Sequence, residues 1–306
     1  MFPTVMIIND AHCHFFSRPF FERLLDDLLR AGGRPPGAGK GVPEIIGWED
    51  PGSPEQLADR WVAELNRHGV ARAVLIASVP GDEASVATAV ARHPSRLVGA
   101  FMLDASATDA SARAARAFGD MALRMACLFP AMHHYRLDDE RVGQLFEAAK
   151  AHHGVVFAHC GVLTIGVRKK LGLPSPFDLR LGDPLALAAT ASRFPEVPVI
   201  VPHFGAGFFR EALMAAEACP NIHLDTSSSN GWIKYYPDLT LVEVFRRALE
   251  IAGPNRLLFG TDSSFFPRGW QKAVYDAQVA ALDAISADAA TRAKIFGGTF
   301  DRIFGI

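Results

Sequence analysis

The fold of this chain is decided by the stretch Thr4-Val5-Met6-Ile7-Ile8-Asn9-Asp10-Ala11-His12-Cys13-His14. Its first part, Thr4–Ile8, is a short apolar run that predicts a buried β-strand, and polar residues follow directly after it. An open sheet that binds a dinucleotide needs a glycine-rich turn after its first strand. The segment from Asp10 to His14 offers no such turn. The sequence therefore excludes a Rossmann-type dinucleotide-binding sheet.

Apolar runs of strand length alternate with amphipathic stretches along the whole chain. The eight predicted strands are Thr4–Ile8, Ala73–Val79, Leu97–Leu103, Ala126–Phe129, Val155–Ala158, Val199–Val201, Ile222–Leu224 and Leu257–Phe259. The predicted helices are Pro54–His68, Glu83–Arg92, Ala105–Phe118, Leu137–His153, Asp183–Arg193, Phe208–Ala218, Leu239–Ala252, Gln271–Ile285 and Ala287–Phe304. Strands that alternate with helices in this way predict an α/β fold of the (β/α)8 TIM-barrel type.

We expect one barrel domain over residues 1–306, with loop insertions near residues 31–54 and 161–182. The first insertion is rich in Gly and Pro, and the second is too long for a simple turn after a strand. Both come after predicted strands. They should therefore lie at the C-terminal mouth of the barrel, where long loops form lids and substrate walls.

Composition and charge exclude several classes of protein. Hydrophobic residues make up 49% of the 306 residues, which excludes a disordered chain. The 31 Lys and Arg nearly balance the 33 Asp and Glu, so no basic excess predicts nucleic-acid binding. The apolar run at residues 1–8 is too short for a signal peptide or a membrane span. We therefore expect a small-molecule substrate and no nucleic-acid or membrane partner, with a homodimer left open.

The cysteines favour a reducing, cytoplasmic compartment. They are far apart and form no CxxC pair, so neither a disulfide framework nor a cysteine metal site is predicted. The four are Cys13, Cys127, Cys160 and Cys219. Cys13 and Cys160 each neighbour a histidine, but alternate residues of a strand point to opposite faces, so both are expected in the core.

Histidines and one acid stand at the ends of the predicted strands. His12 and His14 follow the first strand and, being two residues apart, can face the same point. His159, His203 and Asp262 end strands five, six and eight. All five side chains should meet at the C-terminal face of the barrel. Imidazole nitrogens with a carboxylate oxygen form a ligand set suited to Zn²⁺, so we predict a metal site there.

Four short motifs and the final helix resemble the amidohydrolase superfamily, in particular the branch that contains aminocarboxymuconate-semialdehyde decarboxylase. The motifs are Asp10-Ala11-His12-Cys13-His14, Phe157-Ala158-His159-Cys160-Gly161, Val201-Pro202-His203-Phe204-Gly205, Phe259-Gly260-Thr261-Asp262 and the segment from Ile295 to Gly305. Each motif is short, but together, in this order, they span the whole chain.

The resemblance implies one divalent metal, usually zinc, held by His12, His14, His159 and Asp262. It also implies that His203 activates a metal-bound water. Decarboxylases of the resorcylate type usually carry Glu at the position of His12, which argues against that subgroup. No Lys follows the fourth predicted strand, so the two-metal, carbamylated-lysine pattern is not expected.

Three functions remain open at this point. The first is a metal-dependent hydrolase that acts on a small carboxylated or aromatic-derived substrate, with His203 and Asp262 as catalytic groups. The second is a nonoxidative decarboxylase that uses the same residues. The third is a catalytically inactive barrel that binds a ligand. Arg268, Arg180 and His133 are predicted to contact the substrate, because all three follow strands at the mouth.

Overall fold

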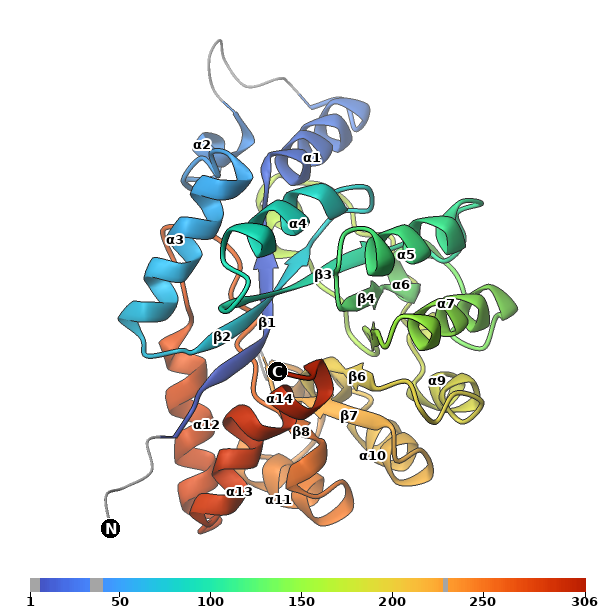
Figure 1. The fold of residues 1–306 in the computed structure, drawn as a ribbon, viewed down its shortest axis with the longest axis vertical. Coiled ribbons are helices and arrows are strands. Elements are labelled where there is room, and N and C mark those ends of the chain that lie inside the picture. The colour runs from blue at the N-terminus through green and yellow to red at the C-terminus, as the bar shows by residue number, and fades with distance from the viewer. Residues whose placement is uncertain (1–5, 34–40, 228–230) are drawn as a thin grey trace.

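The computed structural model describes residues 6–33, 41–227 and 231–306. It contains an eight-stranded parallel sheet in which each strand pairs with the next along the chain (Figure 1). The strands are β1 (Asn9–Phe15), β2 (Arg72–Ala77), β3 (Leu97–Leu103), β4 (Met125–Leu128), β5 (Val155–Ala158), β6 (Val199–Val201), β7 (Ile222–Asp225) and β8 (Leu257–Leu258).

Backbone hydrogen bonds join β1 to the segment that follows β8. Ala11 donates to the carbonyl of Phe259 at 2.9 Å. Asp262 donates to the carbonyl of His12 at 2.9 Å, and His14 donates to that of Ser263 at 2.7 Å. The sheet thus curves round into a barrel, which confirms the predicted (β/α)8 fold.

Helices surround the strands (Figure 1). The α-helices are α1 (Arg18–Arg30), α2 (Val42–Ile45), α3 (Pro54–Arg67), α4 (Glu83–Arg92), α5 (Ala110–Gly119), α6 (Pro130–His133), α7 (Glu140–Ala151), α8 (Gly166–Lys170), α9 (Pro184–Ala191), α10 (Phe209–Ala218), α11 (Leu241–Ile251), α12 (Lys272–Ala284), α13 (Ala289–Ala293) and α14 (Thr299–Phe304). Short 3₁₀ turns cover Leu179–Leu181, Pro202–Gly205, Gly231–Tyr235 and Pro254–Arg256, and a π-turn covers Lys294–Gly298. Among the described residues, no helix has the length and apolar character needed to cross a bilayer.

The predicted first strand was placed too early. Residues 6–8 are not part of a strand, residues 4 and 5 lie outside the described part of the chain, and β1 begins at Asn9. The polar residues that were expected to end the strand are instead buried and hydrogen-bonded within it. Asn9 donates to Asp301 at 2.8 Å, and the backbone N–H of Thr261 donates to Asp10 at 3.1 Å.

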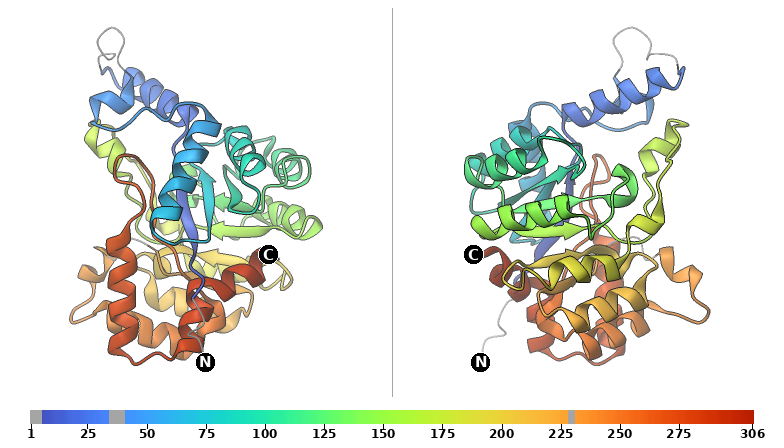
Figure 2. Two further views of the ribbon diagram at one scale, coloured as in Figure 1. Left: turned by 60° about the vertical axis from the view of Figure 1, so that its left-hand side comes forward. Right: turned by 90° about the vertical axis from the view of Figure 1, so that its right-hand side faces the viewer.

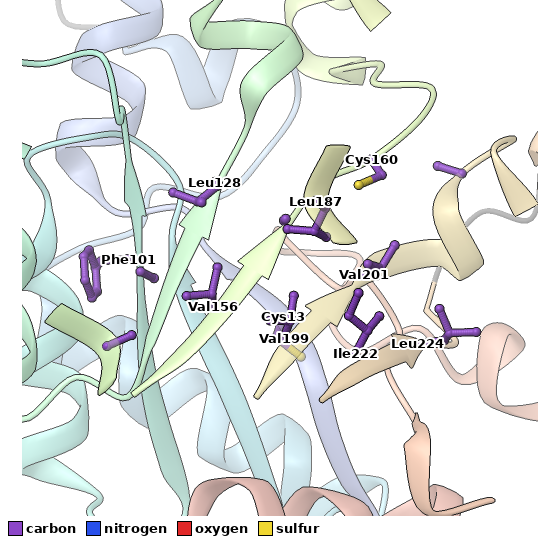
Figure 3. Close-up of a cluster of buried hydrophobic side chains, with 14 of the residues drawn as sticks. Cys13, Phe101, Leu128, Val156, Cys160, Leu187, Val199, Val201, Ile222 and Leu224 are labelled. Atoms are coloured by element: carbon purple, nitrogen blue, oxygen red, sulfur yellow. The ribbon is translucent and has the colours of Figure 1, made fainter. Parts of the chain in front are cut away.

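Alternate residues of the strands fill two separate cores. The outward side chains pack against the helices, and Figure 3 shows part of this layer, with Val156, Val199 and Ile222. The inward side chains, such as Phe157 and Ile200, fill the barrel. Cys13 and Cys160 are fully buried members of the outer core, as their alternation with histidines predicts.

Helix α14 closes the barrel at the N-terminal ends of the strands. Its side chains Phe300, Ile303 and Phe304 join the inner core. Asp301 on the same helix accepts hydrogen bonds from Asn9 and Arg72, the first residues of β1 and β2. The floor of the barrel is thus apolar and filled by side chains, which leaves the opposite end for polar chemistry.

A third hydrophobic cluster covers the C-terminal mouth. It joins Phe20 and Phe21 of α1, Val42 of α2 and Val167 of α8. These segments lie at one end of the molecule in both views of Figure 2. The two predicted insertions therefore meet over the mouth, although residues 34–40 of the first lie outside the described residues. The sequence pattern did not predict α1, which precedes the first insertion.

Candidate metal centre and active site

Three predicted ligands converge where β1 meets the segment after β8. His12, His14 and Asp262 each offer one ligand atom, and these atoms all lie within 4.8 Å of one another. The Nε2 atoms of His14 and His12 lie 3.1 and 3.7 Å from Oδ1 of Asp262. Burial alone would raise the pKa of Asp262, but the neighbouring imidazoles outweigh burial and hold that pKa well below its ordinary value. The carboxylate is therefore ionised and available to a cation.

Hydrogen bonds at the far side of each ring orient the two histidines. Nδ1 of His12 donates to Oδ2 of Asp225 at 2.6 Å. Nδ1 of His14 lies 2.8 Å from Oγ of Ser78, whose own hydroxyl donates to the carbonyl of Ile76 at 2.9 Å. Ser78 therefore accepts from the His14 ring. Both rings thus donate from Nδ1 and direct Nε2 toward Asp262, an orientation typical of metal-ligating histidines.

Asp225 and Ser78 were not predicted as site residues. Asp225 is the last residue of β7, and Ser78 directly follows β2. Both therefore stand at strand ends on the same face as the histidines, and that position was the signal in the sequence. Burial opposes a positive charge on His12, but Asp225 outweighs burial and raises the pKa of His12.

His159 and His203 line the same cavity as the three clustered residues. The ring centre of His203 lies 5.0 Å from the ring centre of His12 and 5.3 Å from that of His159. Burial lowers the pKa of both His159 and His203, so both rings are neutral near pH 7. Nδ1 of His159 is buried and has no hydrogen-bond partner among the described residues, so its lone pair is available to a metal. The imidazole nitrogens of His159 nevertheless lie outside the cluster of three.

Asp262 and His203 both have backbone angles in the left-handed region, with φ of 58° and 56°. Such a conformation in a non-glycine residue is strained and is typical of functional sites. Gln271 stabilises it at Asp262, because its side-chain amide donates to the carbonyls of Thr261 and Asp262 at 2.9 Å. Both residues with this backbone conformation line the cavity.

Asp10 fastens β1 to the loop after β8. Its carboxylate accepts from the hydroxyl of Thr261 at 2.5 Å, from Nε1 of Trp270 at 2.7 Å and from the backbone of His12 at 2.9 Å. Complete burial raises the pKa of Asp10 to about 6. Asp10 does not line the cavity, so its effect on the site is indirect.

The cavity above these residues has a volume of about 480 Å³ and an aromatic wall. The wall consists of stacked rings. The ring centre of Phe16 lies 3.9 Å from that of Phe20 and 5.9 Å from that of Trp48. The ring centre of Trp48 lies 3.8 Å from that of Phe265. The two rings of each pair are nearly parallel. Phe129 and Trp232 also line the cavity. Stacked rings of this kind favour contact with another flat, apolar group.

Arg268 is the predicted substrate contact that lines the cavity. Its guanidinium lies 4.4 Å from the centre of the Phe265 ring and donates to Oγ of Ser264 at 2.6 Å. It also donates to the carbonyl of Asp262 at 3.4 Å, which places it beside the candidate metal ligands. Lys170 and Lys234 line the same cavity. The outer wall is thus cationic and suits an acidic substrate.

Arg180 and His133 are placed elsewhere. The Arg180 side chain is 89% exposed and pairs with Asp178 at 2.7 Å. His133 ends the short helix α6, where burial lowers its pKa. Neither belongs to the described residues that line the cavity, so their predicted contact with a substrate bound there gains no support.

Residues 10–306 match the sequence model of the amidohydrolase family. The chain belongs to the amidohydrolase family. This match confirms the resemblance drawn from the motifs and the interpretation of the chain as an enzyme of hydrolase or carboxy-lyase type. No curated protein matches this amidohydrolase in sequence.

Solved structures share the fold at low sequence identity. A 5-carboxyvanillate decarboxylase from Novosphingobium aromaticivorans, in complex with manganese and 4-hydroxy-3-methoxy-5-nitrobenzoic acid, is 16% identical with a TM-score of 0.66, over 99% of this chain and 97% of that one. An amidohydrolase from Burkholderia multivorans with bound zinc is 15% identical with a TM-score of 0.63, over 98% and 99%. A probable 2-pyrone-4,6-dicarboxylic acid hydrolase from Acinetobacter baumannii is 13% identical with a TM-score of 0.63, over 98% and 100%.

The donor set of this amidohydrolase fits a single divalent ion. Imidazole nitrogens together with an ionised carboxylate are typical ligands of zinc and related metals. Hydrogen bonds to Asp225 and Ser78 hold the two rings in the ligating tautomer. Nδ1 of His159, which has no hydrogen-bond partner within residues 6–33, 41–227 and 231–306, is a further electron-pair donor at the same cavity.

Proposed function

We propose that this amidohydrolase is a metal-dependent hydrolase that acts on a small carboxylated, aromatic-derived substrate. The observation that carries the proposal is the convergence of His12, His14 and Asp262 at a cavity that also presents His203, an aromatic wall and Arg268. Ligands, a base and a cation for an acid group thus face one space large enough for a small molecule.

The proposed ligands are His12, His14 and Asp262, with His159 as a fourth. We propose zinc as the ion, because neutral imidazole with carboxylate is its commonest catalytic ligand set. When bound, the ion would lower the pKa of a coordinated water to about 7 and polarise a carbonyl oxygen of the substrate. The histidines must be neutral to bind it, and burial favours the neutral form of His14 and His159.

His203 is the proposed general base. Its Nδ1 is engaged by Ser227, with 2.9 Å to Oγ and 3.2 Å to the backbone oxygen. Because an acceptor occupies that side, Nε2 carries a free lone pair and can take the proton of the attacking water. The proton then passes to the leaving oxygen of the substrate. Asp262, itself a proposed ligand, is the proposed second proton acceptor.

Arg268 is the proposed anchor for a substrate carboxylate. A guanidinium binds a carboxylate through two parallel N–H donors, and Phe265 beneath it limits the directions it can take. A planar substrate held at one end by Arg268 would lie along the Phe16 and Trp48 rings. Its reacting carbon would then stand near His203.

Nonoxidative decarboxylation is the second candidate function. The observation that favours it is the shared fold with the 5-carboxyvanillate decarboxylase over nearly the full length of both chains. The same residues could protonate the carbon that bears the carboxylate, after which CO₂ leaves. Both reactions require His203 and the metal ligands, so substitutions there cannot separate them, whereas the products can.

Two trial substrates test the proposal on zinc-loaded protein. Hydrolysis of 2-pyrone-4,6-dicarboxylic acid opens a cyclic ester with uptake of water, whereas 5-carboxyvanillate can only lose CO₂. We expect His203→Ala to retain its zinc and to lose about 10²–10⁴-fold in turnover, the usual contribution of a general base. CO₂ release without hydrolysis would replace the hydrolase by the decarboxylase. Protein that retains no metal would favour the inactive, ligand-binding barrel.

A further inference from the structure

Ser227 occupies the centre of a buried network that the proposed reaction does not yet use. It follows β7 and is completely buried. Its Oγ lies 2.9 Å from Oδ2 of Asp225, 2.9 Å from Nδ1 of His203 and 3.0 Å from Nδ1 of His12. One hydroxyl therefore contacts the carboxylate behind a metal ligand and the ring of the proposed base.

The directions of these hydrogen bonds follow from the donors available. A carboxylate only accepts, so the hydroxyl of Ser227 donates to Asp225, and Nδ1 of His12 donates to the same oxygen at 2.6 Å. With its proton used in this way, the Ser227 hydroxyl oxygen can only accept, and Nδ1 of His203 donates to it at 2.9 Å while also lying 3.2 Å from the backbone oxygen of Ser227. A continuous chain of donors and acceptors thus runs from His203 through Ser227 to Asp225, and from Asp225 to His12.

We propose that Ser227 is a positioning residue that joins His203 to the Asp225–His12 pair, so that one buried carboxylate orients the base and a metal ligand together. The inference rests on the proposed role of His203 as the base. A hydrogen bond to a charged acceptor strengthens the bond made by the intervening hydroxyl, because the donors and acceptors of a chain polarise one another. Asp225 thereby acts on His203 without touching it.

Local backbone structure holds Ser227 close to Asp225. The backbone N–H of Ser227 donates to Oδ1 of Asp225 at 2.6 Å, which closes a turn typical of Asp. Gly260 packs against this turn. A Cβ at position 260 would lie 2.7 Å from Oδ1 of Asp225, 2.9 Å from Cβ of Ser227 and 3.0 Å from Cβ of His12. Glycine at 260 is therefore needed for the close approach of the three residues.

A spectroscopic experiment separates this role from a merely structural one. The Nδ1–H resonance of His203 can be recorded in ¹⁵N-histidine-labelled, zinc-loaded protein and identified by its absence in His203→Gln. We expect Asp225→Asn to move this resonance, although the two side chains do not touch in the described network. We expect Ser227→Ala to move the resonance as well. In protein that already carries Ser227→Ala, we expect Asp225→Asn to cause no further shift of the resonance.

The kinetic counterpart is a loss in kcat without a matching change in KM. Outer hydrogen-bond partners of a metal site contribute about 10–100-fold to activity, so Ser227→Ala should lose at least about tenfold in kcat. Zinc content should remain one equivalent, because the His12–Asp225 contact is kept. Ser227→Cys, which preserves the volume but bonds weakly, should resemble Ser227→Ala and serves if the alanine variant does not fold.

Thr226→Val is the matched control. Thr226 is the neighbouring residue, is equally buried, and donates its hydroxyl to Gln278 at 2.7 Å, away from both histidines. Its loss should move neither the His203 resonance nor kcat. The proposal is overturned if Ser227→Ala leaves the resonance in place, or if Asp225→Asn moves it equally in both backgrounds. The position of the His203 resonance does not depend on the substrate. If neither trial acid is turned over, the proposed function fails, but the resonance still tests the role of Ser227. The two failures are therefore distinguishable.

Discussion

Replacing Asp225 by Asn should weaken zinc binding about tenfold. Asp225 is completely buried, and its Oδ2 accepts from Nδ1 of His12 at 2.6 Å. A hydrogen bond to a charged group contributes about 1.5–3 kcal/mol, and one between neutral groups about 0.5–1.5 kcal/mol. Asn keeps one oxygen that can accept from His12, so for this bond the loss is the difference between these values, while its amide NH2 replaces the oxygen that accepts from the backbone of Ser227. A difference of about 1.4 kcal/mol corresponds to a tenfold change in Kd.

Competition with a chromophoric chelator measures this change in metal-free protein titrated with zinc at fixed pH. Asp225→Ala removes the acceptor altogether and should cost about 100-fold in affinity, the upper part of the range for outer-shell partners. Asp178→Asn is the control, because Asp178 pairs with the exposed Arg180 outside the cavity. The Asp225→Ala variant must unfold at the same temperature as the native protein for the comparison to hold. If its zinc Kd is then unchanged, the contact does not orient His12.

Three further outcomes follow from the structure. Zinc affinity should fall as the pH falls through the raised pKa of His12, because the metal must then displace a proton from this ring. In the same chelator assay, log Kd should rise by up to about one for each unit by which the pH falls. Arg268→Lys should raise KM for an acidic substrate more than for its uncharged ester, because Lys cannot form the two parallel bonds; equal effects in steady-state kinetics would contradict the clamp. Phe300→Ala should lower the free energy of unfolding by about 3–5 kcal/mol in denaturant titration, because Phe300 is 1% exposed in the barrel floor, and a loss under about 1 kcal/mol would show that the floor repacks.

The sequence predicted the barrel because its dominant signal, apolar runs alternating with amphipathic stretches, depends on local periodicity. It misplaced β1, because Asn9 and Asp10 resemble strand-ending residues unless their distant partners are known. Those partners are Asp301 and Thr261, nearly the whole chain length away. A buried polar residue in a strand cannot be recognised from local pattern alone.

The candidate ligands could be predicted for a related reason. Strand ends in a barrel share one face, so His12, His14 and Asp262 had to approach one another. Asp225 and Ser227 were missed because their importance lies in contacts between different strands, which no single segment reveals. Arg180 shows that a position at the mouth is not enough to predict a contact with the substrate. Its position in a loop at the mouth did not determine the direction of its side chain, which pairs with Asp178 in solvent.

The α14 helix has a consequence for the order in which the barrel is made. Its residues 299–304 supply Phe300 and Phe304 to the inner core and are synthesised after all eight strands. A ribosome-bound chain that has already exposed β1 to β8 still lacks the apolar floor that completes the inner core. Asn9 and Asp301, which touch in the finished barrel, are separated by 292 positions in the chain. Contacts of such long range form late. The open barrel must therefore be protected from aggregation until nearly all of these residues have left the ribosome.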